Sequence, residues 1–336
     1  MRRGEHERFV PTLIANAPRF IISTTGRDLR VVLTGPQNNF LRVLVIDAHV
    51  HLYPPELNRD PAGWAATQRE PHWGMLCTRL RKNGRPVQAF PSVDELLRTM
   101  DAAGVDHAVL LGWYWENHET CIRQNRFYAD CTRTHPDRLS AFATVHPSAG
   151  VAALDEVRRA HGEGLIGLGE LSTHSQHLEP DDANWHAVLD LAGKLSLPVN
   201  LHVTDPGGGN YPGRVETPLV DFVSLARAFP TVNFILAHWG GRLWREASPL
   251  PPNVFLDTAA SPLLYDQAIF AEGVQACGAD RVLWGTDYPL DLYPHDGGVG
   301  TMGGFLSDAR AALPVAATQN ILGGNAARLL GLALRA

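Results

Sequence analysis

Short apolar runs alternate with amphipathic segments along the chain from residue 41 onward. The runs have the length and composition of buried strands, whereas the segments between them repeat their apolar positions with the period of a helix. Near-continuous apolar strands separated by helices are typical of a parallel sheet covered by helices. Eight such runs predict an α/β fold, a closed (β/α)₈ TIM barrel, rather than an open doubly wound sheet. The predicted strands are 41–52, 106–113, 139–147, 165–172, 198–205, 233–241, 253–260 and 281–289.

The connections between the strands differ in how clearly the sequence defines them. Apolar residues recur at i, i+3, i+4 and i+7 from Val93, as on one face of a helix. Ser92 and Glu95 form a capping box at the start of this helix, and Gly104 stands where its C-terminal cap is expected. The sixth crossover offers barely two helical turns between Gly241 and Asn253, which predicts a short or irregular connection.

The chain divides into a barrel domain, residues 41–336, and an N-terminal extension, residues 1–40. The extension lies outside the repeating pattern and has no assigned role. Its runs RFIIS and LRVVLT predict either two extra strands packed on the barrel or a poorly ordered segment. A loop from Tyr53 to Pro91 follows the first strand. Loops of this length in compact enzymes are usually lids or substrate-shaping segments.

The composition and net charge of the chain limit the classes of molecule that it is expected to bind. The formal net charge of −6 argues against a nucleic-acid or anionic-membrane surface. Neither a signal peptide nor a membrane span is apparent, and the four scattered cysteines resemble neither a disulfide framework nor a zinc knuckle. We therefore expect a cytoplasmic protein with a small-molecule substrate, and a homodimer is the commonest default assembly.

Potential metal ligands stand at five of the predicted strand ends. The carboxyl ends of barrel strands meet at one face, where active sites are built. His49 and His51 point to the same side because side chains alternate along a strand. Buried ionisable groups that converge on one point are costly unless a metal or mutual pairing offsets their desolvation. The candidate metal ligands are His49, His51, Glu170, His202, His238 and Asp287.

The same residues lie in motifs that resemble the amidohydrolase superfamily, and within it the amidohydrolase-related branch that includes aminocarboxymuconate semialdehyde decarboxylase. The motifs, spread over residues 44–334, are VIDAHVH, GLGE, NLHV, LAHWGG, LWGTDYP and ILGGNAARLLGL. The resemblance implies a mononuclear centre with four ligands, which are His49, His51, His202 and Asp287. It also implies that His238 acts as an acid/base residue and that Asp287 is both ligand and proton carrier.

Glu170 is the position that divides this superfamily. Some members carry a carboxylated lysine at the end of the fourth strand, but Lys82 and Lys194 are elsewhere in the predicted fold, which excludes that version. A glutamate resembles the TatD-type hydrolases, in which it bridges two metals and His202 and His238 serve the second ion. The alternative is that Glu170 accepts a hydrogen bond and orients a ligand imidazole. The sequence leaves one or two ions open.

Further residues are candidates for the substrate pocket because they follow predicted strands. They are His146, Trp113, His174 and Arg242. Arg242 gives a slight indication of an anionic substrate.

The resemblance and the ligands together suggest a function. Nitrogen and carboxylate donors suit Zn²⁺ best, with Mn²⁺, Fe²⁺ or Co²⁺ as other occupants. The leading hypothesis is a metal-dependent hydrolase that directs an activated water at a small amide, lactone or ester, with Asp287 and His238 as catalytic residues. The first alternative is a metal-dependent non-oxidative decarboxylase or hydratase acting on a small carboxylic acid. A barrel that has lost turnover and only binds its ligand is a third hypothesis.

Overall fold

The computed structural model describes residues 19–25, 28–34, 43–295 and 301–333. The chain forms two compact units, Met1–Arg42 and Val43–Ala336. In the first unit, strands β1 (Arg19–Thr25) and β2 (Asp28–Thr34) pair antiparallel. The runs RFIIS and LRVVLT of the extension therefore lie in the two strands of a hairpin.

The second unit contains eight parallel strands, one within each predicted run. One sheet has the order β3-β4-β5, and the other has the order β6-β7-β8-β9-β10. Each strand therefore lies beside its neighbour in the sequence. The strands are β3 Ile46–Val50, β4 His107–Leu110, β5 Leu139–Ala141, β6 Leu168–Leu171, β7 Val199–Leu201, β8 Phe234–Leu236, β9 Val254–Asp257 and β10 Val282–Leu283.

The two sheets meet at both of their edges. A parallel bridge joins Ala143 to Leu168 beyond the end of β5, and a second joins Val50 to Tyr288 beyond the end of β10. Backbone hydrogen bonds continue both junctions, for example from Gly169 N to the Ala143 carbonyl at 2.8 Å. The eight strands thus follow one another around a ring, and the predicted (β/α)₈ TIM barrel is confirmed.

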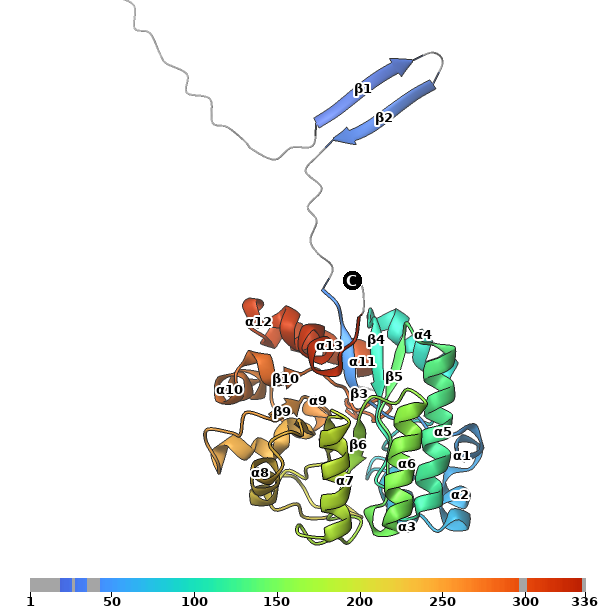
Figure 1. Cartoon of the computed structure of the whole chain (residues 1–336). Coiled ribbons are helices and arrows are strands. Elements are labelled where there is room, and N and C mark those ends of the chain that lie inside the picture. The colour runs from blue at the N-terminus through green and yellow to red at the C-terminus, as the bar shows by residue number, and fades with distance from the viewer. Residues whose placement is uncertain (1–18, 26–27, 35–42, 296–300, 334–336) are drawn as a thin grey trace, which may run out of the picture. The chain divides into compact units, whose positions relative to one another are not determined.

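Helices connect the strands and cover the outside of the ring, where α5, α6 and α7 lie side by side (Figure 1). Among the described residues, no helix is both long and apolar enough to cross a membrane. The α-helices are α1 Pro55–Arg59, α2 Pro61–Gln68, α3 Pro71–Cys77, α4 Val93–Ala103, α5 His118–Thr134, α6 Val151–Gly162, α7 Ala183–Lys194, α8 Leu219–Ala228, α9 Ser261–Leu264, α10 Ala268–Cys277, α11 Thr301–Ala312, α12 Val315–Gln319 and α13 Asn325–Leu330. The other helical turns are η1 Pro147–Ala149, η2 His238–Arg245, η3 Ala279–Arg281 and η4 Asn320–Gly324.

Two connections match their predictions closely. Helix α4 begins with the capping box of Ser92 and Glu95, and Gly104 ends it in the left-handed conformation with φ 73°. The sixth crossover is the short element η2, in which residues 238–242 all have φ between 55° and 64°. A left-handed residue other than glycine costs about 1–2 kcal/mol, so the surrounding contacts must hold this turn in place.

The insertion between β3 and α4 is a folded segment rather than an open loop. Helices α1, α2 and α3 pack apolar side chains, such as Leu57, Trp64 and Trp73, against the residues that follow β4. Trp73, for example, lies 5.6 Å from Trp115 and 5.2 Å from Tyr53 between ring centroids. The insertion is therefore fixed to the carboxyl end of the barrel.

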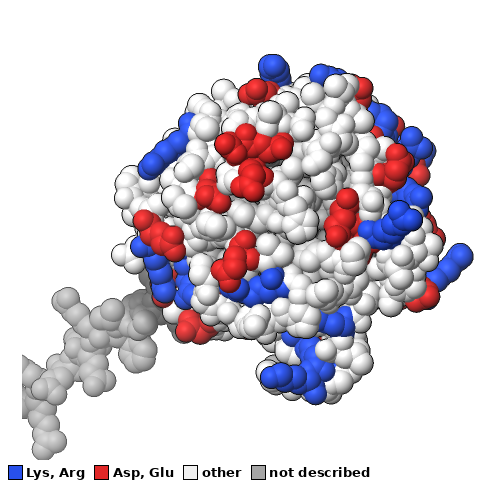
Figure 2. Space-filling model, turned by 90° about the horizontal axis from the view of Figure 1, so that it is seen from below, with Lys and Arg blue, Asp and Glu red and all other residues white. Residues whose placement is uncertain are grey.

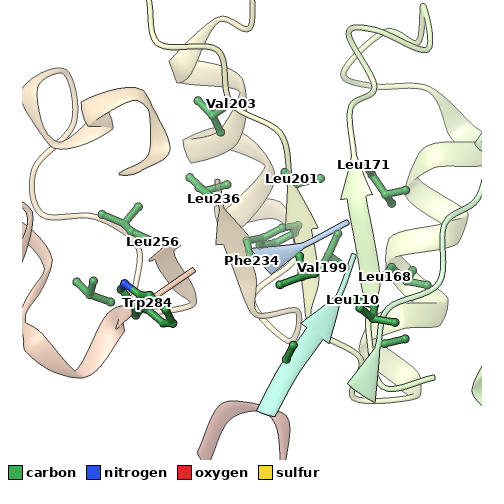
Figure 3. Close-up of a cluster of buried hydrophobic side chains, with 14 of the residues drawn as sticks. Leu110, Leu168, Leu171, Val199, Leu201, Val203, Phe234, Leu236, Leu256 and Trp284 are labelled. Atoms are coloured by element: carbon green, nitrogen blue, oxygen red, sulfur yellow. The ribbon is translucent and has the colours of Figure 1, made fainter. Parts of the chain in front are cut away.

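Alternating strand residues face two separate apolar layers. Leu110 belongs to the large cluster, which also contains helix residues and therefore lies between strands and helices (Figure 3). Its neighbours Val109 and Leu111 belong to a smaller cluster made mostly of strand residues, which fills the inside of the ring. This alternation is the period of two expected for strands that are covered on both faces.

Close packing between β3 and the residues after β10 makes Gly285 sensitive to substitution. A Cβ atom there would lie 2.7 Å from the Cβ of His49 and 3.0 Å from its backbone nitrogen. We expect Gly285→Ala to lower the free energy of unfolding by about 1–3 kcal/mol, because β3 must shift. Denaturant unfolding checks this. Gly162→Ala is the control, since no atom lies within 4 Å of its added methyl group; equal effects of both changes would contradict the packing argument.

Candidate metal centre

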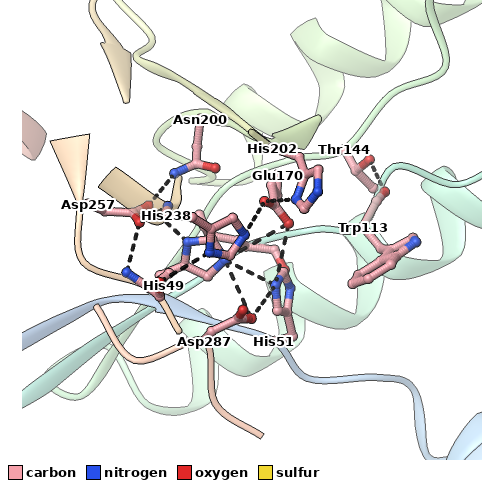
Figure 4. A network of polar contacts seen from close by, with 12 residues as sticks. His49, His51, Trp113, Thr144, Glu170, Asn200, His202, His238, Asp257 and Asp287 are labelled. Atoms are coloured by element: carbon pink, nitrogen blue, oxygen red, sulfur yellow. Dashed lines mark hydrogen bonds and ion pairs between the residues drawn. The ribbon is translucent and has the colours of Figure 1, made fainter. Parts of the chain in front are cut away.

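The six ionisable residues predicted at strand ends meet at the carboxyl end of the barrel (Figure 4). They form two triads, which are His49, His51 and Asp287 on one side and Glu170, His202 and His238 on the other. Within each triad, one potential ligand atom per residue lies within 4.8 Å of the other two. Barrel topology explains the convergence, because side chains distant in sequence follow strands that end at the same face.

The first triad has its imidazole lone pairs turned toward each other. His51 donates from Nδ1 to the carbonyl of Leu111 at 3.0 Å, so its Nε2 carries a lone pair when the ring is neutral. His49 donates from Nδ1 to Asp257 Oδ2 at 2.9 Å, with the same consequence. The two Nε2 atoms are 3.1 Å apart, and Asp287 Oδ1 lies 3.4 Å from that of His51.

Two facing lone pairs at this separation need a positive charge beside them, either a proton or a metal ion. Burial by itself would lower the pKa of His49, but the charge of Asp257, followed by those of Glu170 and Asp287, raises it to about 10. The buried carboxylates thus make the position attractive to cations. The donor set of imidazole nitrogens and carboxylate oxygens fits a divalent metal ion.

Glu170 lies between the two triads and directs one oxygen to each. Its Oε1 accepts from His202 Nδ1 at 2.9 Å, and its Oε2 lies 3.6 Å from His51 Nε2. Burial raises the pKa of Glu170, but the imidazoles, His202 above all, hold it well below its usual range. Glu170 therefore has the position that a bridging ligand requires and also the geometry of an acceptor that orients His202.

His238 begins the left-handed turn η2 and is held from several directions. Its backbone nitrogen donates to Asp257 Oδ1 at 3.1 Å, and its Nδ1 donates to the Ala259 carbonyl at 3.1 Å. The Tyr265 hydroxyl donates to the His238 carbonyl at 2.9 Å. Burial lowers the pKa of His238. Its Nε2 lone pair lies 3.8 Å from Glu170.

Asp257 is a functional residue that the sequence reasoning missed. It ends β9, is fully buried, and receives hydrogen bonds from His49 and from Asn200 Nδ2 at 3.0 Å. Burial raises the pKa of Asp257, but the charge and hydrogen bond of His49 hold it below its usual value. The signal was available, since a carboxylate at the end of a strand stands where the other site residues were found.

A cavity of about 330 Å³ opens above the cluster and is lined by Glu170, His202, His238 and Asp287. Trp113, predicted for the substrate pocket, also lines it and packs edge-on against His51 at 5.5 Å. Its volume is at the lower end of the range for small-molecule sites, about 300–1,000 Å³. Figure 2 views the molecule from the carboxyl ends of the strands and shows acidic side chains across the middle of this face.

The structure does not bring the other three predicted pocket residues to this cavity. Arg242 forms an ion pair with Asp205 at 3.0 Å and lines a separate hollow. His174 pairs with Asp221 at 3.1 Å. His146 is half-buried beyond the end of β5 and is absent from the cavity lining. Only Trp113 of the four therefore lies where a substrate could touch it.

A ring of eight parallel strands with imidazoles and carboxylates at its carboxyl end defines the class, a (β/α)₈ barrel with a candidate metal centre. The chain belongs to the amidohydrolase family, whose sequence model, described as "Amidohydrolase", matches residues 46–332. This confirms the family that the motifs predicted. Because the match begins at β3, the hairpin of β1 and β2 lies outside it.

Solved structures with the same fold include several decarboxylases. The 5-carboxyvanillate decarboxylase from Sphingomonas paucimobilis has a TM-score of 0.67 and 19% identity, with 86% of this chain and 99% of that chain covered. The 2,6-dihydroxybenzoate decarboxylase from Rhizobium has a TM-score of 0.62 and 19% identity, over 86% and 99%. A dihydroxybenzoic acid decarboxylase from Polaromonas sp. JS666, solved with manganese and 2-nitroresorcinol, has a TM-score of 0.61 and 19% identity, over 86% and 97%. At these identities the likeness establishes the fold.

Removing the charge of Asp257 tests its role in orienting His49. Asp257→Asn preserves the shape of the side chain but weakens its hold on the imidazole. We expect the affinity for a divalent metal to fall about 10–100-fold, the usual cost of losing such a partner. This affinity is measured by competition between the protein and a chelator for Mn²⁺ or Zn²⁺. Asp190→Asn, on the exposed face of α7, is the matched control. Unchanged affinity in Asp257→Asn would rule the role out.

Proposed function

We propose that the protein is a metal-dependent decarboxylase that removes CO₂ non-oxidatively from a small carboxylic acid. The observation that supports this proposal most is the charge of the cavity lining, counted without the six residues of the cluster. The charged side chains there are Arg79, Arg81, Arg214 and Asp205. Asp205 is paired with Arg242 and Arg214 is paired with Glu216, so Arg79 and Arg81 leave the remaining lining positive. An acid needs such a lining, whereas a neutral amide, lactone or ester does not.

The relatives support this proposal over the hydrolase that the sequence favoured. The structures most similar in fold include enzymes named for decarboxylating 5-carboxyvanillate and dihydroxybenzoates. Two of them were solved with manganese. Their shared fold is compatible with the same class of reaction on this cluster. Manganese and zinc are both candidate metals here, because imidazole and carboxylate donors suit either ion.

Aromatic side chains form one wall of the cavity beside the cluster. Trp113 and Tyr114 stack at 4.4 Å with 26° between their planes, and Tyr114 lies 5.2 Å from the His202 ring. Such a wall suits the face of a planar, unsaturated acid and excludes water from it. A planar π-system is also the structure that can accept the electron pair left when the carboxylate departs.

A few side chains at the cavity would stabilise charge and transfer the proton during the reaction. A divalent cation held by the cluster would supply Lewis-acid polarisation of a substrate oxygen. The carbon that loses CO₂ must receive a proton from a group that faces the cavity. Asp287 and His238 both line it, and their side chains keep 14% and 8% of their surface exposed. Asp287 carries the proton in this proposal. His238 donates from Nδ1 to the Ala259 carbonyl, and its Nε2 accepts a hydrogen bond from the substrate.

Hydrolysis of a small amide, lactone or ester is the second candidate. The observation that favours it is Glu170, which stands between the two triads as a carboxylate shared by two metals would. Two ions side by side are typical of enzymes that activate water. The number of bound metals and the product formed separate the two candidates.

Release of CO₂ is the direct test of the first proposal. The metal-loaded protein should release CO₂ from hydroxylated benzoic acids, measured as total CO₂ against time. Asp287→Asn should lower kcat by about 10²–10⁴-fold, the usual contribution of a general acid. Asp190→Asn should leave it unchanged. Hydrolysis of amides, lactones or esters without any CO₂ from acids would favour the second candidate instead.

Metal content tests the cluster independently of the reaction. Protein purified without chelator should contain about one or two divalent ions per chain by elemental analysis, because Glu170 of the second triad also directs an oxygen toward the first triad. If Glu170 bridges, Glu170→Gln should lower the content from two ions to one. Chelation should abolish turnover, and Mn²⁺ or Zn²⁺ should restore it. Full activity in metal-free protein would contradict the centre.

A further inference from the structure

Four arginines lie in or beside the cavity, and three of them already have partners. Arg81 donates to the carbonyls of Val87 and Asp291, the latter at 2.7 Å. Arg214 pairs with Glu216 and also donates to the Asp205 carbonyl at 3.2 Å. Arg242, outside the cavity lining, pairs with Asp205 through its guanidinium. The guanidinium groups of these three arginines therefore have hydrogen-bond acceptors within the protein.

Arg79 is different. Its side chain lines the cavity, yet in the part of the chain that the structure describes no carboxylate or carbonyl accepts a hydrogen bond from its guanidinium. Its Nε is buried without a partner, as are those of Arg81 and Arg214, but the terminal nitrogens of Arg81 and Arg214 have acceptors within the protein. A buried donor that lacks an acceptor costs about 1–3 kcal/mol, and more for a charged group. A half-buried guanidinium without a hydrogen-bond acceptor in the protein is stabilised when a bound molecule supplies that acceptor.

The guanidinium is also held in a fixed orientation. Its Cζ lies 5.3 Å from the centroid of the Tyr211 ring, the arrangement of a cation–π contact. Its backbone is fixed in a hairpin, because Val87 N donates to the Arg79 carbonyl at 3.3 Å and Leu80 pairs with Pro86. Stacking on a ring leaves the edge of the guanidinium free, and that edge matches a carboxylate through two parallel hydrogen bonds.

We propose that Arg79 binds a second carboxylate of the substrate, which makes the preferred substrate a planar dicarboxylic acid. This inference rests on the proposed function, because the first carboxylate is the one that the metal cluster removes. Arg79 is separate from that cluster, since it forms no ion pair with Glu170 or Asp287 among the described residues. The cavity therefore offers two recognition points for anions, and Trp113 and Tyr114 also line it.

The test compares two probes that differ by one carboxylate, benzoate and benzene-1,3-dicarboxylate. Calorimetric titration of the full chain loaded with Mn²⁺ should give about tenfold or more tighter binding of the dicarboxylate. In Arg79→Gln this preference should fall to about twofold or less, with benzoate affinity unchanged. Arg79→Lys should keep part of it, because the charge remains while the paired hydrogen bonds are lost.

Lys82→Gln is the matched control, since it removes the same charge from an exposed position on the same hairpin. It should keep the full preference, and all variants should unfold at the wild-type temperature. Equal binding of both probes by the wild type, or an undiminished preference in Arg79→Gln, overturns the inference. Binding is measured without turnover, so these outcomes leave the decarboxylase proposal standing, whereas failure to release CO₂ leaves the role of Arg79 standing.

Discussion

The carboxylate of Asp257 is the interaction on which the geometry of the centre depends. It lies completely buried at the end of β9 and accepts hydrogen bonds from the His49 ring, the Asn200 amide and the backbone nitrogens of His238 and Ala259. These donors come from the ends of four strands or from the turns after them. A buried carboxylate is tolerated only when its oxygens are satisfied in this way. One side chain therefore sets both the tautomer of His49 and the start of the left-handed turn.

The sequence was sufficient for the parts of the structure that follow from periodicity and topology. Eight apolar runs predicted eight strands, and the rule that parallel strands end at one face brought His49, Glu170, His202 and Asp287 together before any coordinates. The same reasoning failed for Arg242. Its closeness to His238 in the sequence suggested a place in the pocket. The left-handed turn at residues 238–242 instead ends with the Arg242 guanidinium against Asp205.

The residues that line the cavity could not be predicted for a related reason. Arg79 and Tyr211 lie on two loops far apart in the sequence, and only long-range contacts place them together. One such contact runs from His72 Nε2 in the insertion to the Gly213 carbonyl at 2.8 Å. Loop conformations of this kind have no periodic signal. The choice between hydrolase and decarboxylase depends on these loops, because the ligand cluster itself suits both reactions.

Under the proposed function, selection of an acid must come from inside the cavity. The net charge is −6, and the face that carries the cavity displays acidic side chains (Figure 2), so long-range attraction of an anion is not expected. Salt screens exposed charges beyond about 8–10 Å, whereas partly buried groups are screened much less. In this proposal the guanidinium of Arg79 therefore acts at short range on a substrate that has already entered. Added salt should alter the rate of entry more than the preference for an acid, because the repelling charges are outside and the binding charges are within.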